Sequence, residues 1–570
     1  MEALKIEDLS FRYPGSTEYA LRGIDISLSE GEVLCLCGQT GCGKTTLLRN
    51  LKMVIAPAGE LTGEITISGV PAKEMSVREQ TKKIGFVMQD PENQIVTDMV
   101  WHELAFGLEN LGEAPAKIRL KTAEAASFFG IESWLGKRTS ELSGGQKQIL
   151  DLAAVMVMSP DILVLDEPTA RLDPVAASEF LSAVRRVNKE LGTTVIISEH
   201  RLDDVLPMAD RMAVMRQGEI AVCGTVREVI KKIPHAAPEM KEALPQVTRA
   251  YLGVQAAVHN GMNAEQYQSD QTSEEVDGQI PLDVAAGRAW ISEMFAGYPA
   301  DGRDVAGSLS GDAREGGWHK NDGVLAEDCQ HQSSAAPAGT KETAAQLKGV
   351  WFAYTREEDA IRGIDLTMHK GETVSILGGN GAGKSTLLSL ISGTVQPFRG
   401  KVRTRLSRSK LPQQPQLLFT EETVAEEIEK DGCSQRLTEL FKLEHLSGRH
   451  PYDLSGGEMQ RLALCEVLGM DADIVLLDEP TKGLDPEYKV KLAGEIGRLK
   501  EEGKAVVVVS HDTEFCARVS DRCIMMAAGE IVADACAADF FAGNDFYTTK
   551  VNRMARHISP RVLLPEDLCR

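Results

Sequence analysis

The chain has 570 residues, enough for two to four domains, and its 43% hydrophobic and 26% charged residues are ordinary for a globular protein. A formal net charge of −22 argues against a protein that coats nucleic acid, because such proteins present a basic surface, so we expect no nucleic-acid partner. The sequence has no apolar run of about 18 residues and no signal-peptide pattern, and its 11 cysteines show no CxxC spacing. It therefore predicts no membrane span, no zinc site and no disulfide framework.

An apolar run, Val33–Cys37, leads into a glycine-rich loop and then into a helical pattern. The loop has the spacing Gly-x4-Gly-Lys-Thr, with Gly38, Gly43, Lys44 and Thr45 at the fixed positions. A strand, a loop and a helix in this order form a P-loop, in which backbone N–H groups and the helix N-terminus surround phosphates. We expect Lys44 to reach the β- and γ-phosphates and Thr45 to ligate Mg²⁺.

Three further motifs follow: LSGGQ (Leu142–Gln146), ILVLDEPT (Ile162–Thr169) and VIISEH, which ends at His200. The second motif is a continuous apolar run that predicts a buried parallel strand ending at Asp166. A carboxylate there suits the Mg²⁺ shell, and the next residue, Glu167, can polarise an attacking water. A capping or salt-bridged carboxylate is the alternative at both positions.

The same motifs recur in the same order in the second half of the chain. They are GGNGAGKST (Gly378–Thr386), LSGGE (Leu454–Glu458), IVLLDEPT (Ile474–Thr481) and VVVVSH, which ends at His511. The second half is shorter between its P-loop and its LSGG motif, which predicts a smaller helical insertion. The chain is therefore an internal duplication.

The stretch between the halves, about residues 236–345, is rich in Gly, Ala, Ser and Gln and is acidic. This composition predicts a partly disordered linker. Two pieces, Pro238–Val254 and Pro281–Ala296, carry spaced apolar residues and are expected to be ordered. We divide the chain into a first domain (1–235), a linker (236–345) and a second domain with a C-terminal tail (346–570).

The P-loop, the LSGG motif, the Asp-Glu pair and the strand ending in His resemble those of the ATP-binding-cassette (ABC) ATPases over both halves. The resemblance implies an α/β fold with two P-loop NTPase domains, each a RecA-like core with an antiparallel β subdomain and a helical subdomain. It also implies ATP hydrolysis with Mg²⁺, in two sites sandwiched between head-to-tail cassettes.

The resemblance assigns functional residues to both halves. The implied catalytic residues are the Walker B glutamates, switch histidines and Q-loop glutamines: Glu167, Glu479, His200, His511, Gln89 and Gln413. The implied nucleotide-binding residues are Tyr13, Gly38, Gly41, Gly43, Lys44, Thr45, Thr46, Ser143, Gly144, Gly145, Tyr354, Gly378, Gly381, Gly383, Lys384, Ser385, Thr386, Ser455, Gly456 and Gly457. The implied Mg²⁺ ligands are Thr45, Gln89, Asp166, Ser385, Gln413 and Asp478.

Some of these positions have a second interpretation or depart from the family pattern. The tyrosines would stack on adenine, although both follow alternating β patterns and could be core or edge tyrosines. The D-loop aspartates, Asp173 and Asp485, would cross between the cassettes. Glu458 replaces the usual Gln of the signature, at a position where the family tolerates variation.

The segments after the two Q-loop glutamines, Gln89–Asn110 and Gln413–Ile428, are similar to those of energy-coupling factor (ECF) ATPases, which drive vitamin and transition-metal uptake. This resemblance implies a peripheral protein on the cytoplasmic face of the membrane. Its partners would be an integral membrane scaffold and a separate substrate-binding membrane protein. A twin-cassette translation factor acting on ribosomes is the alternative, although its linker would be basic.

Two further hypotheses concern side chains near these motifs. Cys42, inside the first P-loop beside Lys44 and a helix N-terminus, is expected to be a reactive thiol. Apolar residues after the Q-loop glutamines are expected to line a groove for a partner helix; they are Ile95, Val96, Phe106, Leu417, Leu418 and Phe419.

Overall fold

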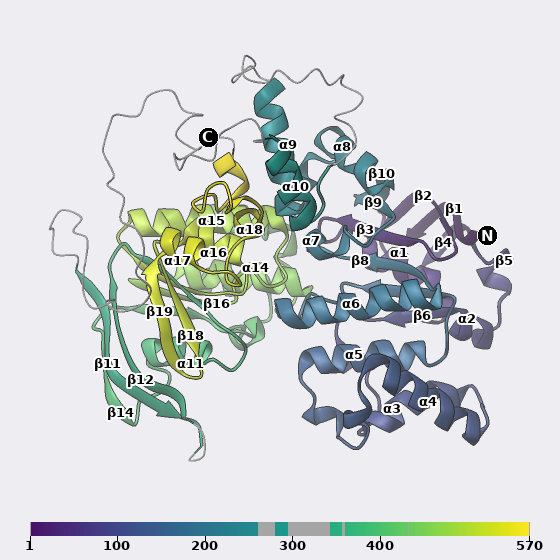
Figure 1. Ribbon diagram of the computed structural model, residues 1–570, viewed down its shortest axis with the longest axis horizontal. Helices are drawn as coiled ribbons and strands as arrows, with labels where there is room; N and C mark the ends of the chain where they lie inside the picture. The colour runs from purple at the N-terminus through teal and green to yellow at the C-terminus, as the bar shows by residue number, and fades with distance from the viewer. Residues whose placement is uncertain (1, 260–279, 295–341, 356–358, 431, 569–570) are drawn as a thin grey trace.

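The computed structural model describes residues 2–259, 280–294, 342–355, 359–430 and 432–568. Two α/β cassettes lie side by side, the first drawn in purple to blue and the second in green to yellow (Figure 1). Among the described residues, no helix combines the length and the apolar character needed to cross a bilayer.

The first cassette is built on two sheets. The larger has the strand order β10-β9-β3-β8-β7-β6 and is parallel except for the β9–β10 pair, and the smaller is antiparallel with the order β2-β1-β4-β5. The strands are β1 Glu2–Arg12, β2 Leu21–Ser29, β3 Val33–Gly38, β4 Glu60–Ile67, β5 Val70–Pro71, β6 Ile84–Val87, β7 Ile162–Asp166, β8 Thr194–Ser198, β9 Arg211–Arg216 and β10 Glu219–Thr225. Strands β3, β7 and β8 are buried along their whole length, as their continuous apolar sequences predict.

Helices cover the larger sheet and form a separate layer below it (Figure 1). They are α1 Lys44–Leu51, α2 Val77–Lys83, α3 Val100–Asn110, α4 Pro115–Phe129, α5 Gly144–Met156, α6 Pro174–Leu191, α7 Leu202–Val205 and α8 Val226–Ala236. One apolar core lies between the parallel sheet and the helices α5 and α6, and a second lies between the two sheets around α1. Because neighbouring parallel strands end at one edge, the P-loop, Asp166 and His200 are brought together.

The second cassette repeats this plan with the strand orders β15-β16-β17-β13-β18-β19 and β12-β11-β14. Its strands are β11 Thr343–Ala353, β12 Asp359–His369, β13 Thr373–Leu377, β14 Arg399–Arg403, β15 Arg408–Leu411, β16 Ile474–Asp478, β17 Ala505–Val509, β18 Arg522–Ala527 and β19 Glu530–Cys536. Its helices are α11 Lys384–Ser392, α12 Val424–Lys430, α13 Gln435–Leu440, α14 Gly456–Gly469, α15 Pro486–Glu501, α16 Thr513–Val519 and α17 Ala537–Gly543. Helices α12 and α13 are shorter than α3 and α4, which confirms the smaller helical insertion.

A small helical unit, here called the helical junction, contacts both cassettes. It consists of α9 (Gln246–His259), α10 (Val284–Met294), α18 (Lys550–Ala555) and the short helix η12 (Pro565–Leu568), so both segments expected to be ordered in the linker contain helix. Its core combines residues of the linker and the C-terminal tail: Val247, Ala250, Ile291, Val551, Met554, Ala555 and Val562. A Cβ atom at Gly287 would lie 2.3 Å from Val247 and 2.6 Å from Met554, so any larger residue would displace these side chains from the close packing of α10. Residues 295–341 lie outside the described part of the chain.

Candidate active sites

Each P-loop curls around the amino group of its own lysine. Lys44 Nζ donates to the carbonyl oxygens of Gly38 (3.0 Å) and Gln39 (3.4 Å), and Lys384 Nζ donates in the same way to Gly378 (2.8 Å) and Gly379 (2.9 Å). Gly43, at the start of α1, has a φ of 107°, where a side chain would be strained and would also strike the Ala20 carbonyl. The loops therefore point backbone N–H groups and a lysine into one phosphate-sized space.

The carboxylates predicted from the DEP motif lie at the ends of β7 and β16. Asp166 Oδ1 accepts hydrogen bonds from Thr45 Oγ1 (3.2 Å) and from Ser198 Oγ (2.9 Å). Glu167 follows with a φ of 46°, and Glu479 has a φ of 51° at the equivalent place. Backbone strain of this kind, held by surrounding structure, is typical of functional residues.

Around Glu167 the structure gathers three of the predicted groups. Gln89 Nε2 donates to Glu167 Oε2 (3.1 Å), His200 Nε2 lies 2.8 Å from Glu167 Oε1, and Lys44 Nζ lies 3.6 Å from the same oxygen. Burial alone would raise the pKa of Glu167, but the hydrogen bond from His200 and the charges of His200 and Lys44 lower it to about 2. This glutamate is therefore ionised at neutral pH.

Glu479 lies in a different environment in the second cassette. His511 Nε2 is 3.5 Å from its Oε1 atom, and the His511 backbone N–H donates a long hydrogen bond of 3.4 Å. Burial raises the pKa of Glu479 to about 7, and Asp478 adds to the rise, while Lys384 only partly offsets it. Burial and the charge of Lys384 lower the pKa of His511 to about 4, so the two sites differ electrostatically.

Asp478, the counterpart of Asp166, has an unused coordinating atom. Its side chain is buried, and its Oδ1 atom has no hydrogen-bond partner among the described residues. Burial raises the pKa of Asp478, and a hydrogen bond from Ser385 opposes that rise. A buried carboxylate oxygen beside a P-loop hydroxyl is the ligand pair that Mg²⁺ prefers, so these residues fit the ion.

The D-loop aspartates reach from one cassette to the other. Asp485 accepts hydrogen bonds from the backbone N–H of Thr40 (2.9 Å) and from its hydroxyl (2.7 Å), and His200 Nδ1 lies 3.2 Å from Asp485 Oδ1. Asp173 caps α6 and accepts a short hydrogen bond from Asn380, which occupies the place of Thr40 in the second P-loop. The cassettes are therefore paired head to tail.

The LSGG motif of the second cassette faces the P-loop of the first. A cavity of about 1080 Å³ is lined by Tyr13 and Lys44 from one side and by Ser455 and Gly457 from the other. Both signature serines cap their helices in capping boxes, Ser143 with Gln146 and Ser455 with Glu458. Glu458 thus makes the same contact as the glutamine that it replaces.

The two tyrosines are surface residues and not core residues. Tyr13 is 41% exposed and its hydroxyl hydrogen-bonds Thr46 Oγ1 at 2.9 Å, while Tyr354 is 66% exposed and lies 3.3 Å from Thr386 Oγ1. Each ring packs edge to face with a phenylalanine, Phe11 or Phe352, and its exposed part is available to stack on a base.

Gln413 does not reproduce the position of Gln89. Its side chain is exposed, makes no hydrogen bond within the described residues, and lines the cavity that contains the first P-loop. The prediction that it ligates Mg²⁺ at the second site has no supporting contact here.

The structure contradicts the expected reactivity of Cys42. The side chain is only 7% exposed, and burial raises the pKa of its thiol even though Lys44 opposes the shift.

Sequence reasoning also missed Thr40 and Ser198, which donate hydrogen bonds to Asp485 and Asp166. The only sequence signal for Thr40 is a polar residue at the same P-loop position, Asn380, in the second half.

Comparisons with known proteins agree with this geometry. The family model described as ABC transporter matches residues 21–170 and 361–482. A protein of Bacillus thuringiensis subsp. konkukian, provisionally named an ABC transporter ATP-binding protein, is 35% identical over 99% of this chain and 97% of its own length. A protein of Streptomyces coelicolor with the same provisional name is 33% identical over 98% of each chain.

Among solved structures, the archaeal ribosome recycling factor aABCE1, in complex with the ribosomal stalk protein aP1, has a TM-score of 0.56 and 20% identity. The alignment covers 94% of this chain and 91% of that one. At this identity the likeness concerns the fold alone. The chain belongs to the ABC transporter family and is an ATPase with two ATP-binding cassettes in tandem.

Proposed function

We propose that this chain is the ATP-hydrolysing subunit of an energy-coupling factor importer for a vitamin or a transition metal. It would bind at the cytoplasmic face of the membrane to an integral scaffold protein, with a separate membrane protein binding the substrate. Relatives that match along their whole length and carry ABC transporter names support the transport part of this proposal.

The observation that carries the proposal is a set of exposed apolar side chains beside both Q-loops. We call Val96, Trp101, Phe106 and Leu417 the Q-loop apolar surface; they are 68%, 45%, 38% and 72% exposed. Three of these residues lie in the first cassette and one in the second. Apolar side chains exposed near the Q-loop are typical of a surface that docks partner helices.

A buried glutamate in each cassette fixes the loop that carries Val96 or Leu417. The Glu103 carboxylate accepts hydrogen bonds from the N–H groups of Val96 (3.1 Å) and Thr97 (2.8 Å). In the second cassette Glu427 accepts from the N–H groups of Thr420 and Glu421 in the same way. The backbone of both loops is thus pre-positioned, which lowers the entropic cost of docking.

Part of the expected groove belongs to the protein interior. Phe419 is 5% exposed and packs in a core of the second cassette, Leu418 packs partly against the same core, and Ile95 packs partly against a helical cluster of the first cassette. Sequence patterns could not distinguish these residues from their exposed neighbours Val96 and Leu417.

The proposed roles of the site residues follow from the contacts. Lys44 and Lys384 would bind phosphate, Glu167 and Glu479 would polarise the attacking water, and the two switch histidines would contact the γ-phosphate. Thr45, Asp166 and Gln89 at one site, and Ser385 and Asp478 at the other, would hold Mg²⁺. The ion would neutralise charge that develops on the phosphates.

Because Gln89 contacts Glu167 and begins the loop that ends at Val96, the hydrolytic site and the docking surface are connected.

Pull-down from native membranes tests this function. Val96→Asp and Leu417→Asp should each reduce recovery of an integral membrane partner about tenfold or more, since a charge in an apolar contact costs ~2 kcal/mol or more. Their ATPase rate in membrane-free solution should stay within about twofold of wild type. Val77→Asp, at a residue 66% exposed on α2, is the matched control and should change neither quantity. Co-sedimentation with ribosomes without any integral membrane protein would replace the importer with the translation-factor alternative.

A further inference from the structure

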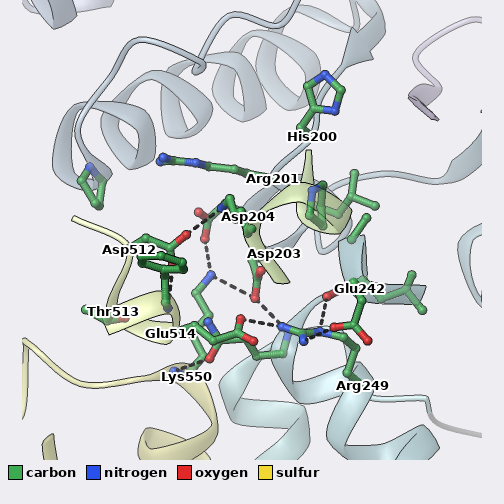
Figure 2. A pocket seen from close by; sticks show the side chains of 18 of the residues that line it. His200, Arg201, Asp203, Asp204, Glu242, Arg249, Asp512, Thr513, Glu514 and Lys550 are labelled. Atoms are coloured by element: carbon green, nitrogen blue, oxygen red, sulfur yellow. Dashed lines mark hydrogen bonds and ion pairs between the residues drawn. The ribbon is translucent and has the colours of Figure 1, made fainter. Parts of the chain in front are cut away.

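Two basic residues of the helical junction form ion pairs that cross between the cassettes. Each follows one cassette in the chain and contacts the other. Arg249 lies on α9, after the first cassette, and its Nη2 atom is 2.5 Å from Glu514 of the second. Lys550 lies on α18, after the second cassette, and its Nζ atom is 2.7 Å from Asp204 and 3.6 Å from Asp203 of the first. Figure 2 shows both ion pairs at one pocket.

The acidic partners belong to the segments that follow the switch histidines. Asp203 and Asp204 lie on α7, which begins two residues after His200. Glu514 lies on α16, which begins two residues after His511. Each junction contact therefore lies within four residues of a switch histidine, on the same continuous backbone.

The guanidinium group of Arg249 is fixed and largely shielded from water. The residue is 9% exposed, its Nε atom donates to the Leu244 carbonyl (3.1 Å), and its Nη1 atom lies 3.0 Å from Glu242. A buried ion pair with this many hydrogen bonds is less screened than a surface pair and holds a defined geometry.

Helices α9 and α18 of the junction are also connected directly. The backbone N–H of Lys550 donates to Gln246 Oε1 (2.9 Å), and the N–H of Gln246 donates to Asp203 Oδ1 (3.2 Å). A cavity of about 210 Å³ lies between these groups and is lined by both switch histidines as well as by Arg249 and Lys550. One connected set of polar contacts thus joins the two histidine segments.

We propose that Arg249 and Lys550 are positioning residues that couple the two ATP sites, each holding the segment after the switch histidine of the opposite cassette. When one histidine engages or releases its nucleotide, the attached helix shifts the shared junction, and the junction shifts the other histidine. The sites then respond to ATP as a pair. This coupling rests on the roles proposed above for His200 and His511.

The ATP dependence of turnover in the purified full chain measures the coupling. Two coupled sites give a Hill coefficient that approaches ~2, whereas independent sites give ~1. Lys550→Met should lower the coefficient to about 1 while turnover at saturating ATP stays within about threefold, and Lys550→Arg should restore it. Lys117→Met, which removes an exposed ion pair with Glu113, is the matched control and should leave the coefficient unchanged.

Further variants distinguish a loss of coupling from an effect of the substitution on folding alone. Asp204→Asn removes the partner of Lys550 from the other cassette, and Arg249→Lys keeps the charge but loses the forked contacts, so both should also lower the Hill coefficient. A wild-type coefficient of 1, or an unchanged coefficient in Lys550→Met and Asp204→Asn, overturns the coupling. His200→Ala and His511→Ala distinguish a failure of the proposed histidine roles from a failure of the coupling. If both variants keep full turnover, the histidine roles are wrong. If both lose turnover while Lys550→Met remains cooperative, only the coupling is wrong.

Discussion

The Nδ1 atom of His200 lies 3.2 Å from the Oδ1 atom of Asp485, so a switch histidine of the first cassette contacts the D-loop of the second. The other ring nitrogen of His200 lies 2.8 Å from Glu167. The histidine thus connects the proposed catalytic base of one cassette with a residue that only the paired arrangement supplies.

Asp485→Ala should lower turnover about tenfold, because Thr40 loses its acceptor and His200 loses the group that orients it. Asp485→Asn, which keeps one acceptor oxygen, should lower it less. Steady-state ATPase rates measure this, with Asp98→Ala, at a side chain 81% exposed, as the control. Equal rates for Asp485→Ala and wild type would mean that the contact with His200 has no part in turnover.

Glu167→Gln and Glu479→Gln should each lower turnover by about 10²-fold or more, since an amide cannot accept the proton of the attacking water. The double variant should bind ATP and retain it unhydrolysed. Rapid filtration with labelled nucleotide distinguishes trapped ATP from released product. A single variant with the full wild-type rate would identify a site that does not hydrolyse.

The residual turnover of the two single variants should differ in its pH dependence. In Glu167→Gln the remaining proposed base is Glu479, whose pKa is about 7. Lowering the pH from 8 to 6 protonates it and should reduce the residual rate about tenfold. In Glu479→Gln the remaining proposed base is Glu167, with a pKa of about 2, so its ionisation does not change over this range. Two parallel pH profiles would contradict the electrostatic difference between the sites.

Cys42 should resist alkylation at pH 7.5, because its raised pKa leaves little thiolate and only 7% of the residue is exposed. Iodoacetamide should leave the ATPase rate within about 20% of wild type, since modification follows the thiolate. Intact-mass and peptide analysis show which thiols react, and the same treatment of Cys42→Ala is the control. Inactivation that MgATP slows and that Cys42→Ala abolishes would restore the reactive-thiol hypothesis.

Asp151 should lower the free energy of unfolding as the pH rises. It lies buried on α5 without a hydrogen-bond partner for either oxygen among the described residues, and burial together with Glu103 and Asp90 raises its pKa from 3.8 to about 8. Between these values the unfolded chain releases the proton while the folded chain keeps it, so the free energy of unfolding falls as pH rises.

Asp151→Asn imitates the protonated form and should increase the free energy of unfolding by on the order of 3 kcal/mol at pH 8, and by less at pH 5. Denaturant unfolding at both pH values measures the difference, with the exposed Asp98→Asn as the control. A gain that is equal at pH 5 and pH 8 would show that Asp151 is ionised in the folded chain.

Much of the architecture could be predicted from the sequence, because its signals are local. Continuous apolar runs predict buried parallel strands such as β7, and the glycine spacing predicts the strand–loop–helix at Lys44. The shorter second insertion, read from motif spacing alone, appears as the shorter helices α12 and α13.

What could not be predicted depends on how distant segments meet. The contact of Thr40 with Asp485 joins residues 445 positions apart, and no local pattern encodes it. The partners of Arg249 and Lys550 likewise depend on the placement of both cassettes. The exposure of individual residues could not be predicted either. Leu417 is on the surface and Phe419 is in the core, although both are apolar residues of one short loop.

The helical junction also has an evolutionary consequence. Helices α9 and α10 belong to the chain between the cassettes and pack on α18. The two cassettes of one chain therefore meet at an effective concentration in the millimolar range, whatever the protein concentration in the cell. In a protein made of two identical cassettes, every substitution would appear in both sites at once. Here a substitution at Thr40 leaves its counterpart Asn380 untouched, so the contacts with Asp485 and Asp173 can diverge independently. The joined chain therefore lets selection adjust one ATP site while the other keeps working.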